Sequence, residues 1–185
     1  LFKSERLEKL TLISLRTFVA SWIVLLPLIA WTAWGSASAL HAILLVSSGV
    51  LVWTLFEYAM HRYLFHLESK VPVIRWLIFL IHGNHHADPG DPLRGLMPLP
   101  VSVGVGLMIW AGCVAVLGMA GTWAFLGFMI GYVIYDAVHY ACHQLPMRGK
   151  MASRLKRHHM RHHYVDDERN FAISAIFWDR VFRSR

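Results

Sequence analysis

Two long stretches of the sequence contain no charged residue. Asp, Glu, Lys and Arg are all missing from Thr17 to Phe56, and again from Gly95 to Tyr135. Each stretch has about 40 residues, and one bilayer crossing takes about 20 apolar residues, so each is long enough for two crossings. With 56% hydrophobic residues in a chain of 185, the sequence does not match an ordinary soluble domain and is typical of a membrane protein.

Cysteine is also scarce, because the sequence has only Cys113 and Cys142. The two match neither a zinc-binding nor a disulfide pattern. Cys142 falls on the side predicted below to be cytoplasmic, where a disulfide is not expected. Cysteine chemistry therefore gives no indication of function.

Turn-forming residues divide each uncharged stretch. Gly35–Ser38 divides the first and Gly118–Thr122 divides the second. We therefore predict an all-α fold: an integral membrane four-helix bundle in a single domain over residues 1–185. The predicted membrane helices lie at about 17–34, 39–61, 99–119 and 122–143, and a helical cap is formed by 62–98 and 144–185.

Positive charge is confined to the segments outside these helices. All 18 Lys and Arg residues fall before the first helix, between the second and third, or after the fourth. The positive-inside rule makes that side cytoplasmic and places both termini there. The net charge of +7 is then explained by topology and anionic headgroups, so nucleic-acid binding is not expected.

Histidine, in contrast, is abundant, with 12 in the sequence. His41 falls near the start of the second helix, on the far side, and is expected to be an interfacial or packing residue. The other 11 fall on the cytoplasmic side, mostly at spacings that put imidazoles on one helix face. About ten imidazoles suit two ions of Zn, Cu, Fe or Ni, so the pattern predicts a two-metal site. The groups are His61 and His66; His82, His85 and His86; His139 and His143; His158, His159, His162 and His163.

Two details of these groups need local structure. His61 and His66 are five residues apart, which predicts a helix end or bend between them. Residues 71–81 are apolar except for Arg75 and too short to span a bilayer. This run is predicted to be an interfacial or re-entrant helix that presents His82–His86.

Two carboxylates accompany the histidines. Glu57 precedes His61 by one helical turn, and Asp136 precedes His139 by three residues. A charge at the end of a membrane helix is costly without a role. We predict that each accepts a hydrogen bond from an imidazole and fixes its orientation. The alternative is an ion pair at the helix end, for example between Glu57 and Arg62.

Five segments carry a family resemblance. In their order and spacing they resemble the fatty acid hydroxylase/sterol desaturase superfamily, and among its members the sphingolipid fatty acid 2-hydroxylases most. The resemblance covers about residues 53–182 and implies a non-haem dimetal oxygenase. Such an enzyme hydroxylates a lipid acyl chain at the carbon next to the carbonyl, with O₂ and an electron donor. The segments are Glu57–His66, His82–His86, Tyr135–His143, His159–Tyr164 and Trp178–Phe182.

The resemblance also implies ten metal ligands and two iron ions, for which zinc can substitute in purified protein. His158 falls outside the family pattern, although helix geometry alone would admit it. The implied ligands are His61, His66, His82, His85, His86, His139, His143, His159, His162 and His163. The expected acyl groove is lined by Trp53, Phe56, Tyr63, Phe65 and Tyr140.

The sequence departs from the longer family members at two points. It has no His-Pro-Gly-Gly haem motif of a cytochrome b5 domain, so a separate redox protein of cytochrome b5 or ferredoxin type is expected to supply electrons. This absence and the compact chain favour a bacterial inner membrane. The segment Asn170–Ser174 carries Ala where longer members have Gly, which puts a local turn in question.

Three other functions remain open at this point. Two belong to similar enzymes: a carotenoid ring hydroxylase, and a sterol or other lipid hydroxylase or desaturase. The third is a histidine-rich metal transporter or a haem-carrying electron-transfer protein. A transporter should carry its polar ligands near mid-membrane, whereas these histidines lie at one end. A haem protein would show a Soret band.

Overall fold

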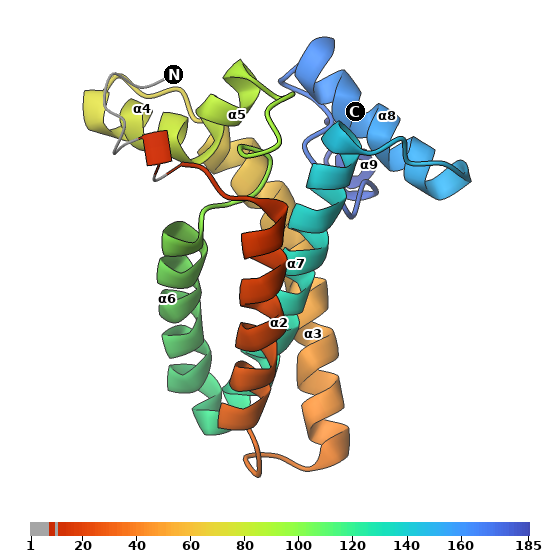
Figure 1. Cartoon of the computed structure of the whole chain (residues 1–185). Coiled ribbons are helices and arrows are strands. Elements are labelled where there is room, and N and C mark those ends of the chain that lie inside the picture. The colour runs from red at the N-terminus through yellow and green to blue at the C-terminus, as the bar shows by residue number, and fades with distance from the viewer. Residues whose placement is uncertain (1–7, 10) are drawn as a thin grey trace.

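The computed structural model describes residues 8–9 and 11–185. Long helices stand side by side as a stalk, and shorter helices form a cap at one end (Figure 1). The stalk helices are α2 (Leu15–Thr32), α3 (Ala39–Ala59), α6 (Leu99–Leu117) and α7 (Gly121–Gln144). The cap elements are the π-helix η1 (Met60–Phe65), α4 (Pro72–Ile78), the π-helix η2 (Phe79–Gly83), α5 (Asn84–Ala87), α8 (Lys150–Tyr164) and α9 (Trp178–Val181). The described residues contain no strand, which confirms the all-α prediction.

The long helices lie close to the predicted segments and are apolar enough for a bilayer. By length and hydropathy, the stretches that can cross a membrane are Leu15–Thr32, Ala39–Phe65 and Leu99–Gln144. The third stretch folds back on itself at the 3₁₀ turn η3 (Gly118–Ala120), which separates α6 from α7. These stretches support a membrane protein. The side on which the termini lie stays a prediction, and Lys3 and Arg6, used for it, lie outside the described residues.

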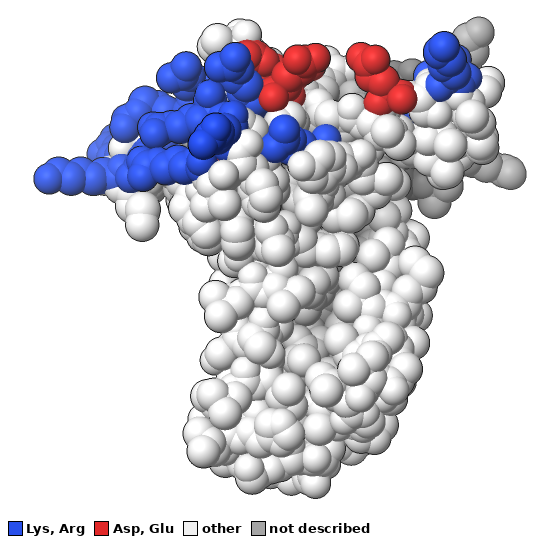
Figure 2. Space-filling view, turned by 180° about the vertical axis from the view of Figure 1, so that it is seen from behind, with Lys and Arg blue, Asp and Glu red and all other residues white. Residues whose placement is uncertain are grey.

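The outer surface of the stalk is apolar. Ile23 and Leu107 are exposed by 67% and 57%, and a water-facing surface rarely leaves so many large apolar side chains uncovered. Lys, Arg, Asp and Glu gather over the cap, and the face of the stalk seen in Figure 2 carries none of them. The stalk therefore matches a lipid environment and the cap an aqueous one.

Aromatic side chains fix α7 at the centre of the stalk. Trp53 on α3 meets Phe128, Tyr132 and Tyr135 of α7 edge-on, with ring centroids 4.9, 5.4 and 5.6 Å away. Edge-to-face packing at such distances is favourable for aromatic rings. This contact sets the register of α7, and so the height at which the next turns of α7 present their polar side chains to the cap.

Glycines let α3 and α7 approach closely. A Cβ atom on Gly127 would lie 1.9 Å from the carbonyl oxygen of Val46, and one on Gly49 would lie 2.0 Å from that of Ala124. Small residues at a helix crossing allow such backbone contact inside membranes. The uncharged sequence did not indicate which glycines have this role.

We expect Gly127→Ala to separate α3 from α7 and to lower thermal stability. Overpacking a tight contact costs about 1–3 kcal/mol, and here the obstacle is backbone, which yields little. The melting temperature in detergent should fall clearly below that of the wild type. Gly112→Ala is the matched control, because a Cβ on Gly112 of α6 meets nothing within 4 Å. Equal melting temperatures for the two variants would contradict the packing role of Gly127.

Candidate metal centre

The cap brings ten histidines together at the end of the stalk, in two groups of five. In each group, one ligand nitrogen from every residue lies within 4.8 Å of the others. Group one is His61, His66, His82, His86 and His162, and group two is His85, His139, His143, His159 and His163. These are the ten residues that the family resemblance implied.

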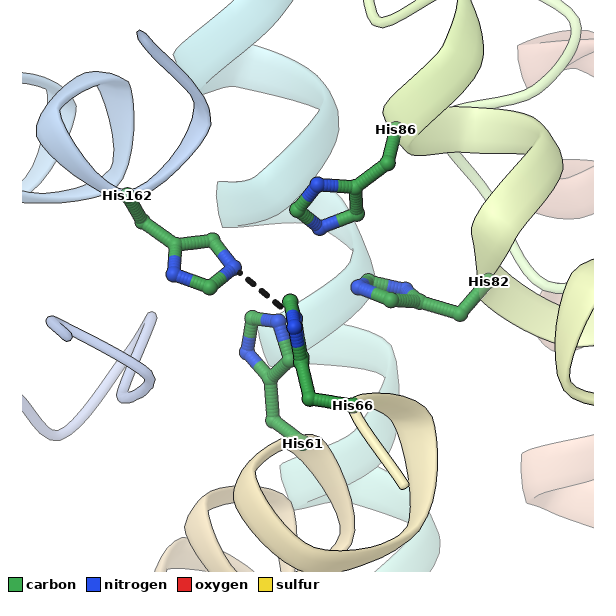
Figure 3. Close-up of side chains that lie close together, drawn as sticks. All are labelled: His61, His66, His82, His86 and His162. Carbon is green, nitrogen blue, oxygen red and sulfur yellow. Dashed lines mark hydrogen bonds between the residues drawn. The ribbon is translucent and has the colours of Figure 1, made fainter. Parts of the chain in front are cut away.

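Three separate parts of the chain build group one (Figure 3). His61 lies in η1 and His66 directly follows it, His82 and His86 come from η2 and α5, and His162 comes from α8. The imidazoles turn toward one shared space, and Nε2 of His162 lies 3.1 Å from Nε2 of His66. Residues far apart in sequence thus converge on one point, as ligands of a metal ion do.

The π-helical turn η1 explains the spacing of the first pair. A π-helix closes its hydrogen bonds from residue i to i+5, so residues five apart return to the same side of the helix. His61 and His66 are five apart, and both point into group one. The helix ends at Phe65, between the two histidines, which confirms the predicted helix end, and its last turn is a π-helix.

Group two is held by the top of α7, by α8 and by His85 of α5. Its five Nε2 atoms form one chain of contacts. Consecutive contacts join His139 to His85, His85 to His163, His163 to His159 and His159 to His143, at 2.9, 3.1, 3.1 and 2.8 Å.

Protein groups alone cannot provide hydrogen-bond partners for all the ring nitrogens of group two. The Nδ1 atoms of His85, His159 and His163 are buried without a partner. If the proton of each ring is on Nε2, then Nδ1 is a buried acceptor without a hydrogen-bond donor. If the proton is on Nδ1, then the Nε2 lone pairs of neighbouring rings face one another and repel. Buried polar groups are rarely left unpaired. A cation at the shared point accepts all the Nε2 lone pairs, so the donor set fits a metal ion.

Group one also has buried ring nitrogens that lack a hydrogen-bond partner and that a metal ion would satisfy. The Nε2 atoms of His61, His82 and His86 are buried and have no hydrogen-bond partner. On the other side of its ring, Nδ1 of His61 donates to the carbonyl oxygen of Phe171 at 2.5 Å. His162 donates from Nδ1 to the carbonyl oxygen of Arg169 at 2.7 Å. In both rings the proton is then on Nδ1, and the lone pair of Nε2 is available to a metal ion. Metal-binding histidines are commonly oriented in this way, by a hydrogen bond from the ring nitrogen that does not bind the metal.

The two groups adjoin. The rings of His86 in group one and His163 in group two stack with centroids 4.2 Å apart. His162 and His163, neighbours on α8, contribute to different groups, with centroids 5.5 Å apart. Two ions bound here would therefore be neighbours inside one site.

Burial favours the neutral form of imidazoles in both histidine groups. It lowers the pKa of His86 to about 3 and that of His162 to about 4, helped by neighbouring histidines. The pKa values of His82, His85 and His159 also fall well below the usual range, first because of burial and then because of other imidazoles. A neutral imidazole is the form that binds metal, so the site is in its metal-binding state at neutral pH.

Glu57 does not touch an imidazole. Its carboxylate is buried and accepts hydrogen bonds from the backbone N–H groups of Ile173, Ser174 and Ala175 at 3.3, 2.9 and 3.1 Å. Trp53 Nε1 and the Ser174 hydroxyl also donate to it. The predicted direct contact with a histidine is therefore wrong. Glu57 instead anchors the loop whose Phe171 carbonyl orients His61.

Asp136 acts in the same indirect way. Its Oδ2 accepts from the backbone N–H of Met97 at 3.1 Å, and the nearby Gly95 backbone accepts from His139. The predicted Asp136–imidazole bond is wrong for the same physical reason: at the helix end, a carboxylate is close enough to reach the backbone of the covering loop. The alternative ion pair is absent too, because Arg62 donates to the Tyr58 hydroxyl.

His158 lies outside both groups. Its Nε2 is 2.8 Å from Oδ2 of Asp179. Asp179 is fully buried and also accepts from the backbone N–H groups of Phe171 and Ala172 at 3.0 and 2.9 Å. His158 thus supports the loop that follows α8. Asp179 belongs to the segment Trp178–Phe182 that carries the family resemblance, but its contacts with His158 and the loop depend on the tertiary fold and could not be predicted from the sequence.

The loop after α8 has the turn that the sequence put in question. Asn170, not Ala172, adopts a positive φ, of +58°. Asparagine tolerates this conformation better than most residues. Alanine at position 172 is therefore compatible with the loop.

A mainly apolar cavity lies in the stalk below the two histidine groups. It is lined by α3, η1, α6 and α7 and has a volume of about 120 Å³. Trp53, Phe56 and Phe65 line it as predicted. Tyr63 and Tyr140 do not: Tyr63 is 60% exposed, because η1 turns it outward. Lining residues not predicted include Met97, Gly106, Met129 and Tyr135.

A smaller cavity adjoins this space on the side of the histidines. Its walls include His82 of group one, with His85 and His139 of group two. It shares four wall residues with the apolar cavity, namely Phe65, Ile81, Met97 and Tyr135. The apolar cavity of the stalk therefore lies next to the two histidine groups.

An apolar helical stalk with paired histidine groups at one end defines a class of membrane protein, and comparison with known proteins places the chain within it. The family model described as fatty acid hydroxylase matches residues 46–184. The chain belongs to the fatty acid hydroxylase family.

Individual relatives are similar over much of the chain. The dihydroceramide fatty acyl 2-hydroxylase FAH1 of Arabidopsis thaliana is 33% identical over 98% of this chain and 77% of its own length. The ceramide very long chain fatty acid hydroxylase SCS7 of Saccharomyces cerevisiae is 35% identical over 90% of this chain and 46% of its own. The fatty acid 2-hydroxylase of Homo sapiens is 35% identical over 74% and 38%. The chain thus spans less than half of the yeast and human relatives.

A solved structure is similar as well. The structure of full-length scs7p, in which only the hydroxylase domain is visible, matches with a TM-score of 0.88 and 32% identity. The match covers 96% of this chain and 69% of that one. The likeness extends beyond the histidine motifs to the whole arrangement of stalk and cap.

Proposed function

We propose that this chain is a membrane-bound lipid acyl hydroxylase that acts at the carbon next to the acyl carbonyl. The observation that carries the proposal is the apolar cavity of the stalk, which lies next to two five-histidine groups and shares wall residues with the small cavity that they line. The 2-hydroxylase relatives named above support the same reaction. We further propose a single domain with both termini in the cytoplasm of a bacterial inner membrane.

Two iron ions are the proposed cofactors, one in each histidine group. When bound, they supply the O₂ chemistry that oxidises an unactivated C–H bond, which side chains alone cannot do. Imidazole nitrogens suit iron, as they suit zinc. The set is all histidine and the rings are neutral, so the ligands themselves bring no negative charge to the metals.

The protein's own residues position the acyl chain. Trp53, Phe56, Phe128 and Met129 provide an apolar wall that favours a hydrocarbon over water. At the histidine end the cavity is lined by Phe65, Ile81 and Tyr135, which also line the small cavity beside the histidines. A chain held there presents its carbonyl end, and no mid-chain carbon, to the histidine groups. Carbons further from the carbonyl lie deeper in the stalk and out of reach.

A separate redox protein is the proposed electron donor. Arg154, Arg157 and Arg161 are exposed on α8, on the side away from the histidines, and border a hollow that His158 and Asn170 also line. This part of the cap carries much of the positive charge seen in Figure 2. Positive surface favours an acidic partner by steering its approach. Asn170 directly precedes Phe171, whose carbonyl contacts His61, so the hollow lies near group one.

Reconstitution tests the proposed function. The purified, iron-loaded protein in lipid should convert saturated acyl lipids to 2-hydroxyacyl lipids in the presence of O₂ and a reduced ferredoxin or cytochrome b5. Mass spectrometry of the products locates the hydroxyl group. Reactions without donor or without O₂ should give no product.

The same experiment separates the other candidate functions. Oxidised sterol or carotenoid, with no hydroxylated acyl chain from any tested lipid, would overturn the substrate class. Hydroxylation away from the second carbon would overturn the positioning argument while leaving an acyl hydroxylase. A double bond in place of a hydroxyl would identify a desaturase.

A further inference from the structure

A second apolar groove lies on the other side of α6. Between α2 and α6 the stalk is hollowed by a groove whose walls are almost entirely apolar, with Trp22, Leu25 and Ile29 on one side and Val103 and Leu107 on the other. The helices α2 and α6 both pack on α7, so the groove runs over α7 between them. This groove could not be predicted from the sequence.

This groove shares three wall residues with the apolar cavity between α3 and α6 described above, which is called the acyl cavity below. Ser102 and Gly106 of α6 and Met129 of α7 line both spaces. The acyl cavity opens on the α3 side of α6, and Figure 2 shows the stalk hollowed on the face opposite to that of Figure 1. At this level the contact between Gly106 of α6 and Met129 of α7 lies between the two spaces, because both residues line each of them.

The contact between Gly106 and Met129, called the partition below, consists of one flexible side chain packed on a glycine. A Cβ on Gly106 would lie 3.6 Å from Cζ of Phe125 and 3.7 Å from Sδ of Met129, so the end of the Met129 side chain rests directly on the glycine. Methionine is unbranched and adapts to the space around it. A rotation of its end opens or closes the partition without movement of a helix.

The height of the partition fits an acyl tail. Gly106 is seven residues along α6 from Leu99, which at the helix rise of about 1.5 Å per residue puts it about 10 Å from the metal end of the stalk. A bilayer core is about 30 Å thick, so a long chain held by its carbonyl end must extend well beyond this point, whereas a short chain ends near it.

We propose that Gly106 and Met129 set the acyl-chain length that the enzyme accepts, by letting the tail of a long chain pass between α6 and α7 into the α2–α6 groove. The proposal rests on the proposed acyl hydroxylase function. It assigns the groove to the terminal part of the hydrocarbon chain. In the alternative arrangement, the tail leaves the acyl cavity directly into the lipid between α3 and α6. Gly106 and Met129 then have no effect on chain length.

Competition between two substrates tests the proposal. The iron-loaded protein, with donor and O₂, receives equal amounts of decanoyl and lignoceroyl lipids with the same headgroup, and the ratio of the two 2-hydroxy products is measured. Gly106→Leu fills the partition and should lower the long-to-short ratio at least about tenfold, the effect of a few misfitted methylene groups. Met129→Ala widens the partition and should raise the ratio.

Gly104→Leu is the matched control. It makes the same change on the same helix, and a Cβ at Gly104 meets nothing within 4 Å. Its ratio should equal that of the wild type. If Gly106→Leu does not fold, the Met129→Ala ratio still decides: an unchanged ratio overturns the proposal. An unchanged ratio with Gly106→Leu at full activity does the same. If the wild type hydroxylates neither lipid, the proposed function fails, which is a different result.

Discussion

His85→Ala and His162→Ala should each remove metal from one histidine group and abolish hydroxylation. His162 belongs to group one and His85 to group two. The Nε2 atom of His85 contacts those of both His139 and His163, so its loss opens the centre of the group. Loss of a mere outer contact to a metal ligand costs about 10–100-fold in affinity or activity, so the effect of a lost ligand should be larger.

Metal content per protein, measured by elemental analysis, should fall from about two ions toward one in each single variant. The double variant should bind none. His41→Ala is the control, because His41 is exposed at the far end of the stalk and should leave metal and activity unchanged. Full metal content and activity in either single variant would remove the group concerned from the site.

His158→Ala gives a further comparison within the same helix. His158 contacts Asp179 and no imidazole of either group. Its loss should lower stability, because the buried Asp179 carboxylate loses a donor, but both ions should remain. Spacing on α8 alone does not distinguish His158 from its neighbours; only the fold assigns it to the loop.

Much of this architecture can be predicted from the sequence because the membrane imposes simple rules. A bilayer requires long uncharged helices, and the charge-free stretches around Leu28 and Leu107 therefore define α2, α3, α6 and α7 almost to the residue. Imidazoles three or four residues apart share a helix face, so the histidines of α7 and α8 could be grouped before any coordinates were known.

The rest depends on tertiary contacts that no short pattern encodes. The division of the ten histidines into two groups assigns neighbours such as His85 and His86 to different groups, and this follows from how α5 sits between η1 and α7. The outward turn of Tyr63 follows from η1, since a π-helix shifts each later residue around the axis. That the ten residues bind metal stays a proposal, although their geometry supports it.

The two buried carboxylates show most clearly where sequence reasoning falls short. Their position near the histidines was visible, but their partners are loops from distant parts of the chain. Glu57 holds the loop that contains Phe171, and Phe171 orients His61 of group one. Asp136 holds the segment before α6, whose Gly95 backbone contacts His139 of group two. Each carboxylate thus serves one group.

This division predicts that Glu57→Ala will empty group one and spare group two. The substitution leaves the N–H groups of Ile173, Ser174 and Ala175 buried without their acceptor. Each unsatisfied buried donor costs about 1–3 kcal/mol, so the loop should shift and carry the Phe171 carbonyl away from His61. Iron occupancy, measured separately for the two sites by anomalous X-ray scattering, should fall at group one.

Two further variants separate positioning from general loss of stability. Glu57→Gln keeps one carbonyl oxygen for the backbone donors and should restore part of the group-one occupancy. Asp136→Asn should act on the other side and lower occupancy at group two, because the segment that contacts His139 loses a charged acceptor for Met97. If Glu57→Ala and Asp136→Asn emptied both sites to the same extent, the carboxylates would stabilise the cap as a whole, and neither would belong to one metal.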